Sequence, residues 1–341
     1  IGAARNAARR ATCQNNLRQL GVAMLAQAQR SPSNALCSGA FDWTRDGAVT
    51  ERGWVADMVR SEVPVGEMLC PANPARISQT YEDLLNAPLG SLPSLPCVDV
   101  LGTDTVFAPD GTPITNPCRK IVEDSLAAGS EARRQLVETE ILRKKFNTNY
   151  AASWFLVRSG VVLDNSGNPR PALGGCDTSL KSRNTTRGPL TVTLADQAPV
   201  ASSNIPLLGD GATVGTLPQQ LDNFPSGELT ALSFTSGPVM TADFSTPSFP
   251  PGTPRTGPGG WWAVWNRQVL QDFRGFAPVH SGTCNVLFAD GSVRSLADGN
   301  EDGLLNNGFT VASGGGFADD TQEVLADDVT SMYSVAAKLP K

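Results

Sequence analysis

The sequence is almost without histidine: His280 is the single one among 341 residues. It also lacks a G-x-S-x-G elbow, a Walker loop, an H-E-x-x-H motif and a dinucleotide-binding fingerprint. A hydrolase would therefore have to depend on His280 as its general base. A lone histidine beside serine and glycine is more often a hydrogen-bonded structural residue. We predict that the protein is not an enzyme, with a hydrolase that uses His280 as the alternative.

Paired metal-binding cysteines, basic runs and long apolar runs are also missing. No two cysteines form a C-x-x-C pair, which argues against a zinc site in a chain with one histidine. The formal charge is −6 and the most basic segment, RNAARR at residues 5–10, is short, so we expect no nucleic-acid partner. No run of about 20 apolar residues occurs, and we expect no membrane span in this chain.

The seven cysteines are widely scattered in a chain rich in glycine and proline. This usage favours an oxidising compartment and some disulfides. Cys97 and Cys118 flank two extended arms around the turn APDG, so we predict a disulfide between them. The odd number leaves at least one thiol free or paired between chains. The alternative is that all seven are small buried hydrophobic residues.

Residues 1–30 are predicted to form one helix. They carry strong helix formers, and Leu17, Leu20, Met24 and Ala28 recur with the spacing of one helix face. The first half is rich in alanine, which permits close approach of another helix. The helical pattern begins without an N-cap or an initiator methionine, so we expect that an upstream segment was removed or not included.

Residues 31–341 are predicted to form a globular, β-rich domain. We expect helices at 80–85 and 130–146, and strands within 149–245. The expected strands include YAASWFLVRSGVVLD, residues 150–164, and PLTVTLA, residues 189–195. Residues 285–296, NVLFADGSVRSL, alternate on both sides of Asp290-Gly291. That dipeptide predicts a β-hairpin with a type I′ turn, and it assigns Asp290 and Gly291 to turn formation.

A calcium-loop pattern follows the hairpin, within the segment 280–309. Asp298, Asn300, Asp302, the Leu304 carbonyl and Asn306 occupy positions 1, 3, 5, 7 and 9 of a calcium loop, and glycine stands at position 6. Phenylalanine stands at position 12 instead of the expected acid. A later acid (Asp319, Asp320 or Glu323) or water would have to complete the shell. We predict Ca²⁺ at this loop, and the alternative is a polar turn without an ion.

His280, nine further residues and then Asp290-Gly291 resemble the H-x9-DG motif of a large family of bacterial, pilin-like secreted proteins of unknown function. The segment ARNAARRATCQNNLRQLGVAM resembles the part that follows the membrane-spanning pilin helix, and MLCPANP, TNYAASW and NIPLLGDGA resemble further landmarks. The resemblance implies an α+β, pilin-like fold, in which an N-terminal helix packs on an antiparallel β-sheet with large β-rich insertions. By analogy with major pseudopilins, it also supports calcium at the Asp298 loop.

We therefore predict a non-catalytic structural subunit of a pilus-like filament or other surface assembly. The resemblance implies a location outside the bacterial cell, with membrane anchoring before processing. We expect copies of itself as partners, with other surface proteins or glycans as further candidates. The alternative is a secreted module that binds glycans or a small solute on a platform of Trp261, Trp262 and Trp265. Tryptophans so close together are also explained as anchors of the core.

Overall fold

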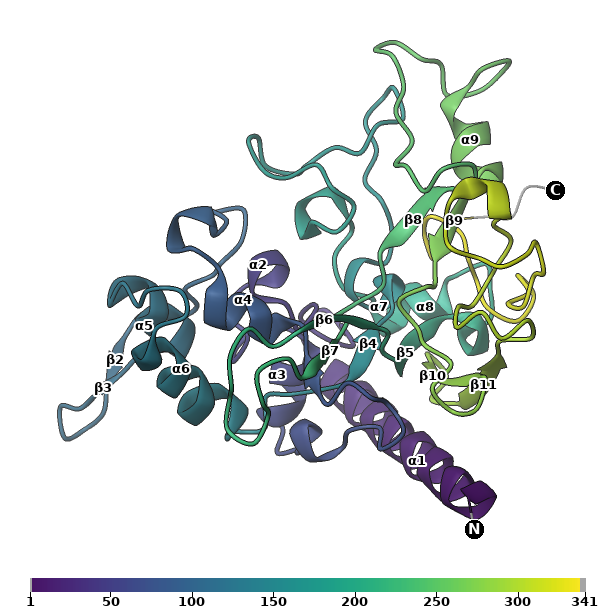
Figure 1. Cartoon of the computed structure of the whole chain (residues 1–341). Coiled ribbons are helices and arrows are strands. Elements are labelled where there is room, and N and C mark those ends of the chain that lie inside the picture. The colour runs from purple at the N-terminus through teal and green to yellow at the C-terminus, as the bar shows by residue number, and fades with distance from the viewer. Residues whose placement is uncertain (1, 338–341) are drawn as a thin grey trace.

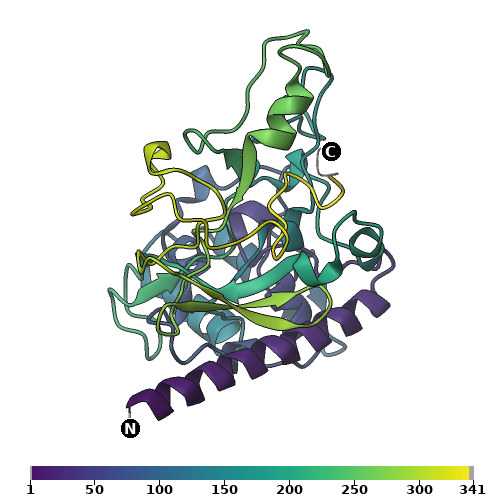
Figure 2. The same ribbon diagram turned by 90° about the vertical axis from the view of Figure 1, so that its right-hand side faces the viewer.

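A single N-terminal helix is the longest element of the chain. The computed structural model describes residues 2–337, and α1 runs from Gly2 to Arg30 (Figure 1). Its buried residues form the predicted face: Cys13, Leu17, Leu20, Gly21, Met24 and Ala28. By contrast, residues 2–12 are exposed apart from half-buried Arg10. The first third of α1 therefore extends beyond the rest of the molecule, as Figure 2 shows.

A four-stranded sheet lies against the buried face of α1. Its order is β11-β10-β5-β4, and every pair is antiparallel. The strands are β4 (Tyr150–Ala152), β5 (Pro206–Asp210), β10 (Thr283–Phe288) and β11 (Val293–Ala297). A Cβ on Gly21 would lie 2.8 Å from Leu287 Cδ1, so the helix backbone rests directly on β10. The predicted α+β class, with a helix on an antiparallel sheet, is confirmed.

Different parts of the chain cover the two faces of this sheet. Alternate side chains of a strand point to opposite faces. Leu287 accordingly packs in the larger core with α1, whereas Val286 and Phe288 pack in a smaller core. Leu305 and Val329 of the C-terminal segment also belong to the smaller core. The sheet is thus enclosed between α1 and the last part of the chain.

Short helices surround this centre. They are α2 (Trp43–Asp46), α3 (Trp54–Val59), α4 (Thr80–Asn86), α5 (Pro117–Glu123), α6 (Glu131–Val137), α7 (Trp154–Arg158), α8 (Val192–Asp196) and α9 (Trp261–Arg267). α6 continues as a π-helical turn at Glu138–Leu142. Shorter 3-10 turns span Val65–Glu67, Leu89–Ser91, Arg183–Thr185, Ser202–Asn204 and Val311–Ser313. The helices predicted at 80–85 and 130–146 correspond to α4 and to α6 with its extension.

The other strands form small sheets at the periphery. β1 (Ile77–Ser78), β7 (Leu229–Ala231) and β6 (Thr213–Thr216) pair in the order β1-β7-β6. β8 (Gly237–Met240) pairs with β9 (Val269–Asp272), and β2 (Val106–Phe107) pairs with β3 (Pro113–Ile114). Long loops connect these strands. Among the described residues, no helix is both long and apolar enough to cross a membrane.

Two of the expected strands are helices at their centres. Residues 150–164 begin as β4, but Ser153 then caps α7 by accepting a hydrogen bond from the Leu156 N–H at 3.0 Å. Within residues 189–195, Thr191 caps α8 in the same way through the Leu194 N–H at 3.0 Å. A hydroxyl that satisfies a free N–H favours helix initiation. These caps override the β propensity of the residues that follow.

The predicted disulfide between Cys97 and Cys118 is wrong, because Cys97 is bonded to Cys176 instead. The arms between the predicted partners do form a hairpin, β2 and β3. After β3, however, Asn116 caps α5, and this helix carries Cys118 into the core, where it is fully buried. The chain therefore never returns to Cys97 at that point.

The C-terminal hairpin is confirmed, but its turn differs from the predicted type. Gly291 has a φ of +83°, whereas Asp290 is not among the described residues with positive φ. The Gly291 N–H donates to the Phe288 carbonyl, and the Phe288 N–H donates to the Ser292 carbonyl. The connection is therefore a three-residue loop with a left-handed glycine rather than a type I′ turn. Asp290 accepts hydrogen bonds from the Ser292 N–H and hydroxyl, as its turn role requires.

Candidate functional site

Four chemically reactive side chains meet between α1 and the sheet. Cys13, Cys70, Asp210 and His280 each offer a ligand atom within 4.8 Å of the other three, and all four residues are buried. Cys13 Sγ lies 3.0 Å from Asp210 Oδ1, and His280 Nε2 lies 3.3 Å from Asp210 Oδ2. The Cys70 Sγ to His280 Nε2 distance is 3.3 Å. We call these four residues the Cys–His–Asp cluster.

The sheet positions the two charged members of the cluster. Asp210 ends β5, and its Oδ2 accepts a hydrogen bond of 2.9 Å from the Asn285 N–H of the neighbouring β10. His280 comes just before β10, where Ser281 and Gly282 both have positive φ. The resulting turn is closed by hydrogen bonds between His280 and Thr283. The carboxylate and the imidazole are thereby fixed on adjacent strand ends.

The two cysteines come from outside the sheet. Cys13 stands on the buried face of α1, and the Tyr150 hydroxyl lies 3.7 Å from its sulfur. Cys70 belongs to a loop whose backbone is held by Asn149. The Asn149 amide accepts from the Cys70 N–H at 2.8 Å and donates to the Cys70 carbonyl at 3.0 Å. Packing of α1 thus positions the Cys13 thiol, whereas hydrogen bonds to Asn149 fix the backbone that carries the Cys70 thiol.

The surroundings shift the pKa values of the cluster members in different directions. Burial lowers the pKa of His280, but hydrogen bonding and charge from Asp210, with a further hydrogen bond from Cys13, raise it to about 9. The hydrogen bond with Cys70 lowers the pKa of Cys13 by more than burial raises it. The same contact and burial raise the pKa of Cys70. The two thiols of the cluster therefore differ in proton affinity, and the imidazole holds its proton more tightly than a free histidine does.

Three kinds of chemistry are open to such a group. Two thiols, an imidazole and a carboxylate are common zinc ligands. The two thiols could instead be oxidised to a disulfide, and a thiol beside histidine and aspartate resembles the constellation of a cysteine nucleophile. However, the cluster members are at most 7% exposed. A substrate could reach them only if the surrounding segments moved apart, so burial favours a structural role.

The sequence pattern indicates one member of the cluster, His280, as a candidate residue and none of the other three. His280 was predicted to brace the fold, and it does join α1, the Cys70 loop and β5. Cys13, Cys70 and Asp210 were not proposed as site residues, and the lack of a C-x-x-C pair argued against zinc. A usable signal existed, because each of the three lies in a segment that carries the family resemblance: ATCQNN, MLCPANP and NIPLLGDGA. TNYAASW supplies Asn149 and Tyr150 around them.

The predicted calcium loop is closed by its own hydrogen bonds. Asp298 accepts from the N–H groups of Asp302 and Gly303. Asp302 accepts from the N–H groups of Leu304 and Ala318. Oxygen ligands suit Ca²⁺, and each of these carboxylate oxygens keeps a second lone pair.

The other loop positions also serve local contacts. Asn300 accepts from the Asp302 N–H and donates to Asp319, and the Asn306 side chain bonds with Phe309. Glu323 closes the loop from downstream by accepting from the N–H groups of residues 299, 300 and 306. Among the described residues, the acidic side chains of this loop do not converge as the Cys–His–Asp cluster does. The geometry shows an ordered polar turn, and calcium stays a prediction for it.

The three neighbouring tryptophans do not form a platform. They lie on α9, where Trp265 is fully buried and Trp261 is 8% exposed. Their indole N–H groups donate to the carbonyls of Gly167 and Asn165. Trp262 is half-buried. The interpretation of these residues as core anchors is confirmed for Trp261 and Trp265. Because their rings are buried, the three tryptophans offer no common exposed face on which a glycan could stack.

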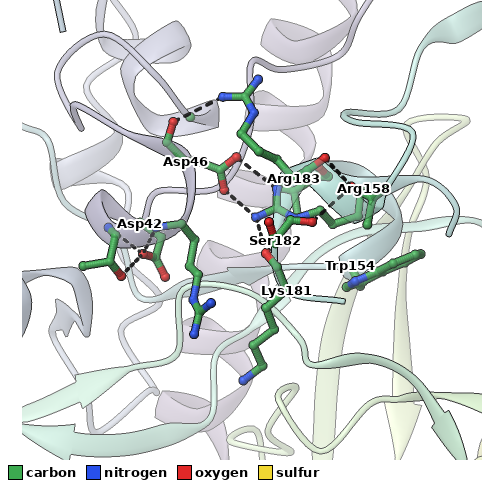
Figure 3. A network of polar contacts seen from close by, with 12 residues as sticks. Asp42, Asp46, Trp154, Arg158, Lys181, Ser182 and Arg183 are labelled. Atoms are coloured by element: carbon green, nitrogen blue, oxygen red, sulfur yellow. Dashed lines mark hydrogen bonds and ion pairs between the residues drawn. The ribbon is translucent and has the colours of Figure 1, made fainter. Parts of the chain in front are cut away.

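A second buried polar network joins α2 to α7 (Figure 3). Asp46 and Arg158 form a bidentate ion pair of 3.0 and 2.8 Å with both side chains at most 1% exposed. Arg158 also donates to the Lys181 carbonyl, and Arg183 donates to the Asp46 carbonyl. Asp42 caps α2. Burial, with nearby negative charges, raises the pKa of Asp42 to about 6.

A polar cavity of about 280 Å³ lies beside this network. Its lining includes two carboxylates, Asp42 and Asp83, and two cationic side chains, Arg45 and Lys181. Small-molecule sites begin at about 300 Å³ and are mostly apolar. The cavity is therefore small for a ligand site, although its alternating charges suit hydroxyl groups.

The chain belongs to a protein family of unknown function. The family model described as "Protein of unknown function (DUF1559)" matches residues 2–303. The match covers α1, the sheet and the whole Cys–His–Asp cluster. No curated protein and no solved structure matches the chain.

Proposed function

We propose that the protein is a non-catalytic structural subunit that assembles with copies of itself outside the bacterial cell. The observation that carries this proposal is the division of α1. Its C-terminal two thirds are locked against the sheet, and residues 2–12 stand free. At 1.5 Å per residue the free part is roughly 16 Å long. A rigid, projecting helix on a fixed base is suited to packing against equivalent helices.

The composition of the free part supports helix–helix packing. Ala4, Ala8 and Ala11 are spaced by four and three residues, so they share one side of α1 and allow another helix to approach closely. The Cys97–Cys176 disulfide is compatible with an extracellular location. The arrangement of His280 and Asp290-Gly291 supports a pilin-like relationship by resemblance alone.

The test compares two alanine-to-glutamate variants of the secreted chain by negative-stain electron microscopy and sedimentation velocity. Ala8 lies in the free part of α1, and Ala26 is exposed where α1 rests on the body. We expect Ala8→Glu to abolish ordered assemblies without changing the melting temperature, because a charge then blocks close helix packing. Ala26→Glu, the matched control, should assemble as the wild type does. Monomeric wild type, or assembly unaffected by Ala8→Glu, would contradict the proposal.

Calcium at the Asp298 loop is a second part of the proposal. Its support is the spacing of the loop oxygens, Asp298 and Asp302 above all, and the extracellular supply of millimolar calcium. Thermal unfolding with excess Ca²⁺ and with EGTA tests it. A calcium-dependent rise in Tm that Asp302→Asn removes is the expected result. Equal Tm values in both conditions would contradict the calcium site and would not bear on the assembly proposal.

Binding of glycans or a small solute is the alternative function, and the polar cavity is the feature that favours it. Its carboxylates can accept hydrogen bonds from hydroxyl groups, and its cationic side chains can donate hydrogen bonds to them. Binding on a glycan array that Asp83→Ala removes would support this function. An array without binding, together with ordered assemblies, would reject it.

A further inference from the structure

We propose that the Cys–His–Asp cluster is a structural zinc site. The ligands are the sulfurs of Cys13 and Cys70, Nε2 of His280 and one carboxylate oxygen of Asp210. Four ligand atoms of three chemical kinds meet at one buried point. This number matches the closed, four-coordinate shell of structural zinc sites, in which no position is left for water.

The distances fit a tetrahedral ion. Zinc bonds of about 2.3 Å to sulfur and about 2.0–2.1 Å to nitrogen or oxygen place neighbouring ligand atoms about 3.3–3.6 Å apart, and two sulfurs about 3.8 Å apart. The sulfur of Cys70 and Nε2 of His280 are 3.3 Å apart, and Nε2 is 3.3 Å from Asp210 Oδ2. The Cys13 sulfur is 3.0 Å from Asp210 Oδ1. The two contacts of Asp210 are made by different carboxylate oxygens, and the other pairs of ligand atoms lie within 4.8 Å of one another. Shifts on the order of 1 Å in the ligand atoms would bring these distances to tetrahedral values and admit the ion.

The ligand types select for zinc. Thiolates favour soft or borderline ions, and a set that combines thiolate, imidazole and carboxylate is typical of zinc rather than of Ca²⁺ or Mg²⁺. Binding releases the proton of each thiol, and any proton on Nε2 of His280, to solvent, and no oxidant or reductant is needed. The product carries Zn²⁺ with two thiolates, one carboxylate and a neutral imidazole.

The alternative of a disulfide between Cys13 and Cys70 explains less of the geometry. A disulfide uses the two sulfurs and needs neither an imidazole nor a carboxylate at the same point. It would leave His280 and Asp210 as a separate buried pair, each at most 7% exposed. The surrounding contacts are also of the kind that orient metal ligands, since the Asn285 N–H holds Asp210 and Asn149 holds the Cys70 backbone.

Such an ion would join four segments that are distant in the sequence. It would link α1 to the Cys70 loop, to the end of β5 and to the turn before β10. Because Cys13 is the first buried residue of α1, the ion would sit where the helix leaves the body. Its structural effect would be to fix the direction in which the free part of α1 points.

The test is metal analysis of the purified 341-residue chain by inductively coupled plasma mass spectrometry. We expect about one zinc per chain in the wild type and less than about one tenth in Cys70→Ser and His280→Gln. Cys37→Ser, which changes another buried free cysteine, is the matched control and should keep its zinc. Removal of zinc and titration with Co²⁺ should produce visible d–d bands and a thiolate-to-cobalt charge-transfer band.

The cobalt spectrum needs only the wild type, so the test stands even if a variant fails to fold. Non-reducing peptide mapping of the same sample separates the alternatives. A Cys13–Cys70 disulfide in a metal-free protein would overturn the zinc site. Free thiols with no bound metal and no cobalt bands would do so as well, and would leave a hydrogen-bonded polar core. Stoichiometric copper or iron instead of zinc would overturn the identity of the ion.

Discussion

Replacing Arg158 with methionine is expected to destabilise the protein strongly. Arg158 donates two hydrogen bonds to Asp46, at 3.0 and 2.8 Å, and further ones to the backbone carbonyls of Lys181 and Val157. No other described donor bonds the Asp46 carboxylate. Methionine keeps much of the side-chain volume but leaves this carboxylate buried without a partner.

The size of the effect follows from that burial. Breaking a buried ion pair by removing one partner costs about 3–5 kcal/mol, because an uncompensated charge stays in the interior. Adding Asp46→Asn to Arg158→Met removes the charge and should recover about 1–3 kcal/mol. Arg45→Met is the matched control. Its ion pair with Asp177 is 38% and 49% exposed, so its loss should cost less than about 1 kcal/mol.

Urea unfolding followed by tryptophan fluorescence, at one pH and with the disulfide intact, measures these differences. A free energy of unfolding for Arg158→Met within about 1 kcal/mol of the wild type would refute the reasoning. A double variant no more stable than Arg158→Met would show that the Asp46 charge is not the cause of the loss.

Three further predictions concern other parts of the fold. Leu20→Ala should lower the free energy of unfolding by about 2–5 kcal/mol in urea unfolding, because it opens a cavity between α1 and the sheet. The control Val22→Ala, at a 69% exposed position, should change the free energy of unfolding little. Reducing the Cys97–Cys176 bond, which closes a loop of 79 residues, should cost about 4.5 kcal/mol in the same assay, and an unchanged midpoint would contradict this. The raised pKa of Asp42 means that the folded state binds its proton more tightly, so stability should fall by at most about 3 kcal/mol as pH rises from about 4 through about 6. Asp42→Asn keeps the helix cap and should flatten that pH dependence.

Local sequence patterns predicted the elements that depend on nearby residues. The face of α1 follows from helical spacing, and the hairpin at residues 285–296 follows from alternation around a turn. α7 and α8 were missed because a single hydroxyl, on Ser153 or Thr191, outweighs the β propensity of the residues after it. In each case the deciding contact spans three residues.

The Cys–His–Asp cluster could not be predicted in the same way. Its members are separated by 57, 140 and 70 positions, from residue 13 to 70, 210 and 280. Only the packing of α1 on the sheet and the pairing of β5 with β10 bring them together. The Cys97–Cys176 bond could not be predicted from local sequence either, because it links two loops that no local pattern relates.

The position of Cys13 has a mechanical consequence. A pulling force on the exposed turns of α1 reaches Cys13 before any other buried residue of the helix. Cys13 contacts Asp210 at the end of β5. Asp210 in turn contacts His280, which precedes β10. β5 and β10 are interior strands, each paired on both sides. Tension on α1 would therefore be passed to two interior strands, each held by hydrogen bonds on both sides, and not to an edge strand held on one side. The attachment at Cys13 would thus transfer force from the helix to the middle of the sheet.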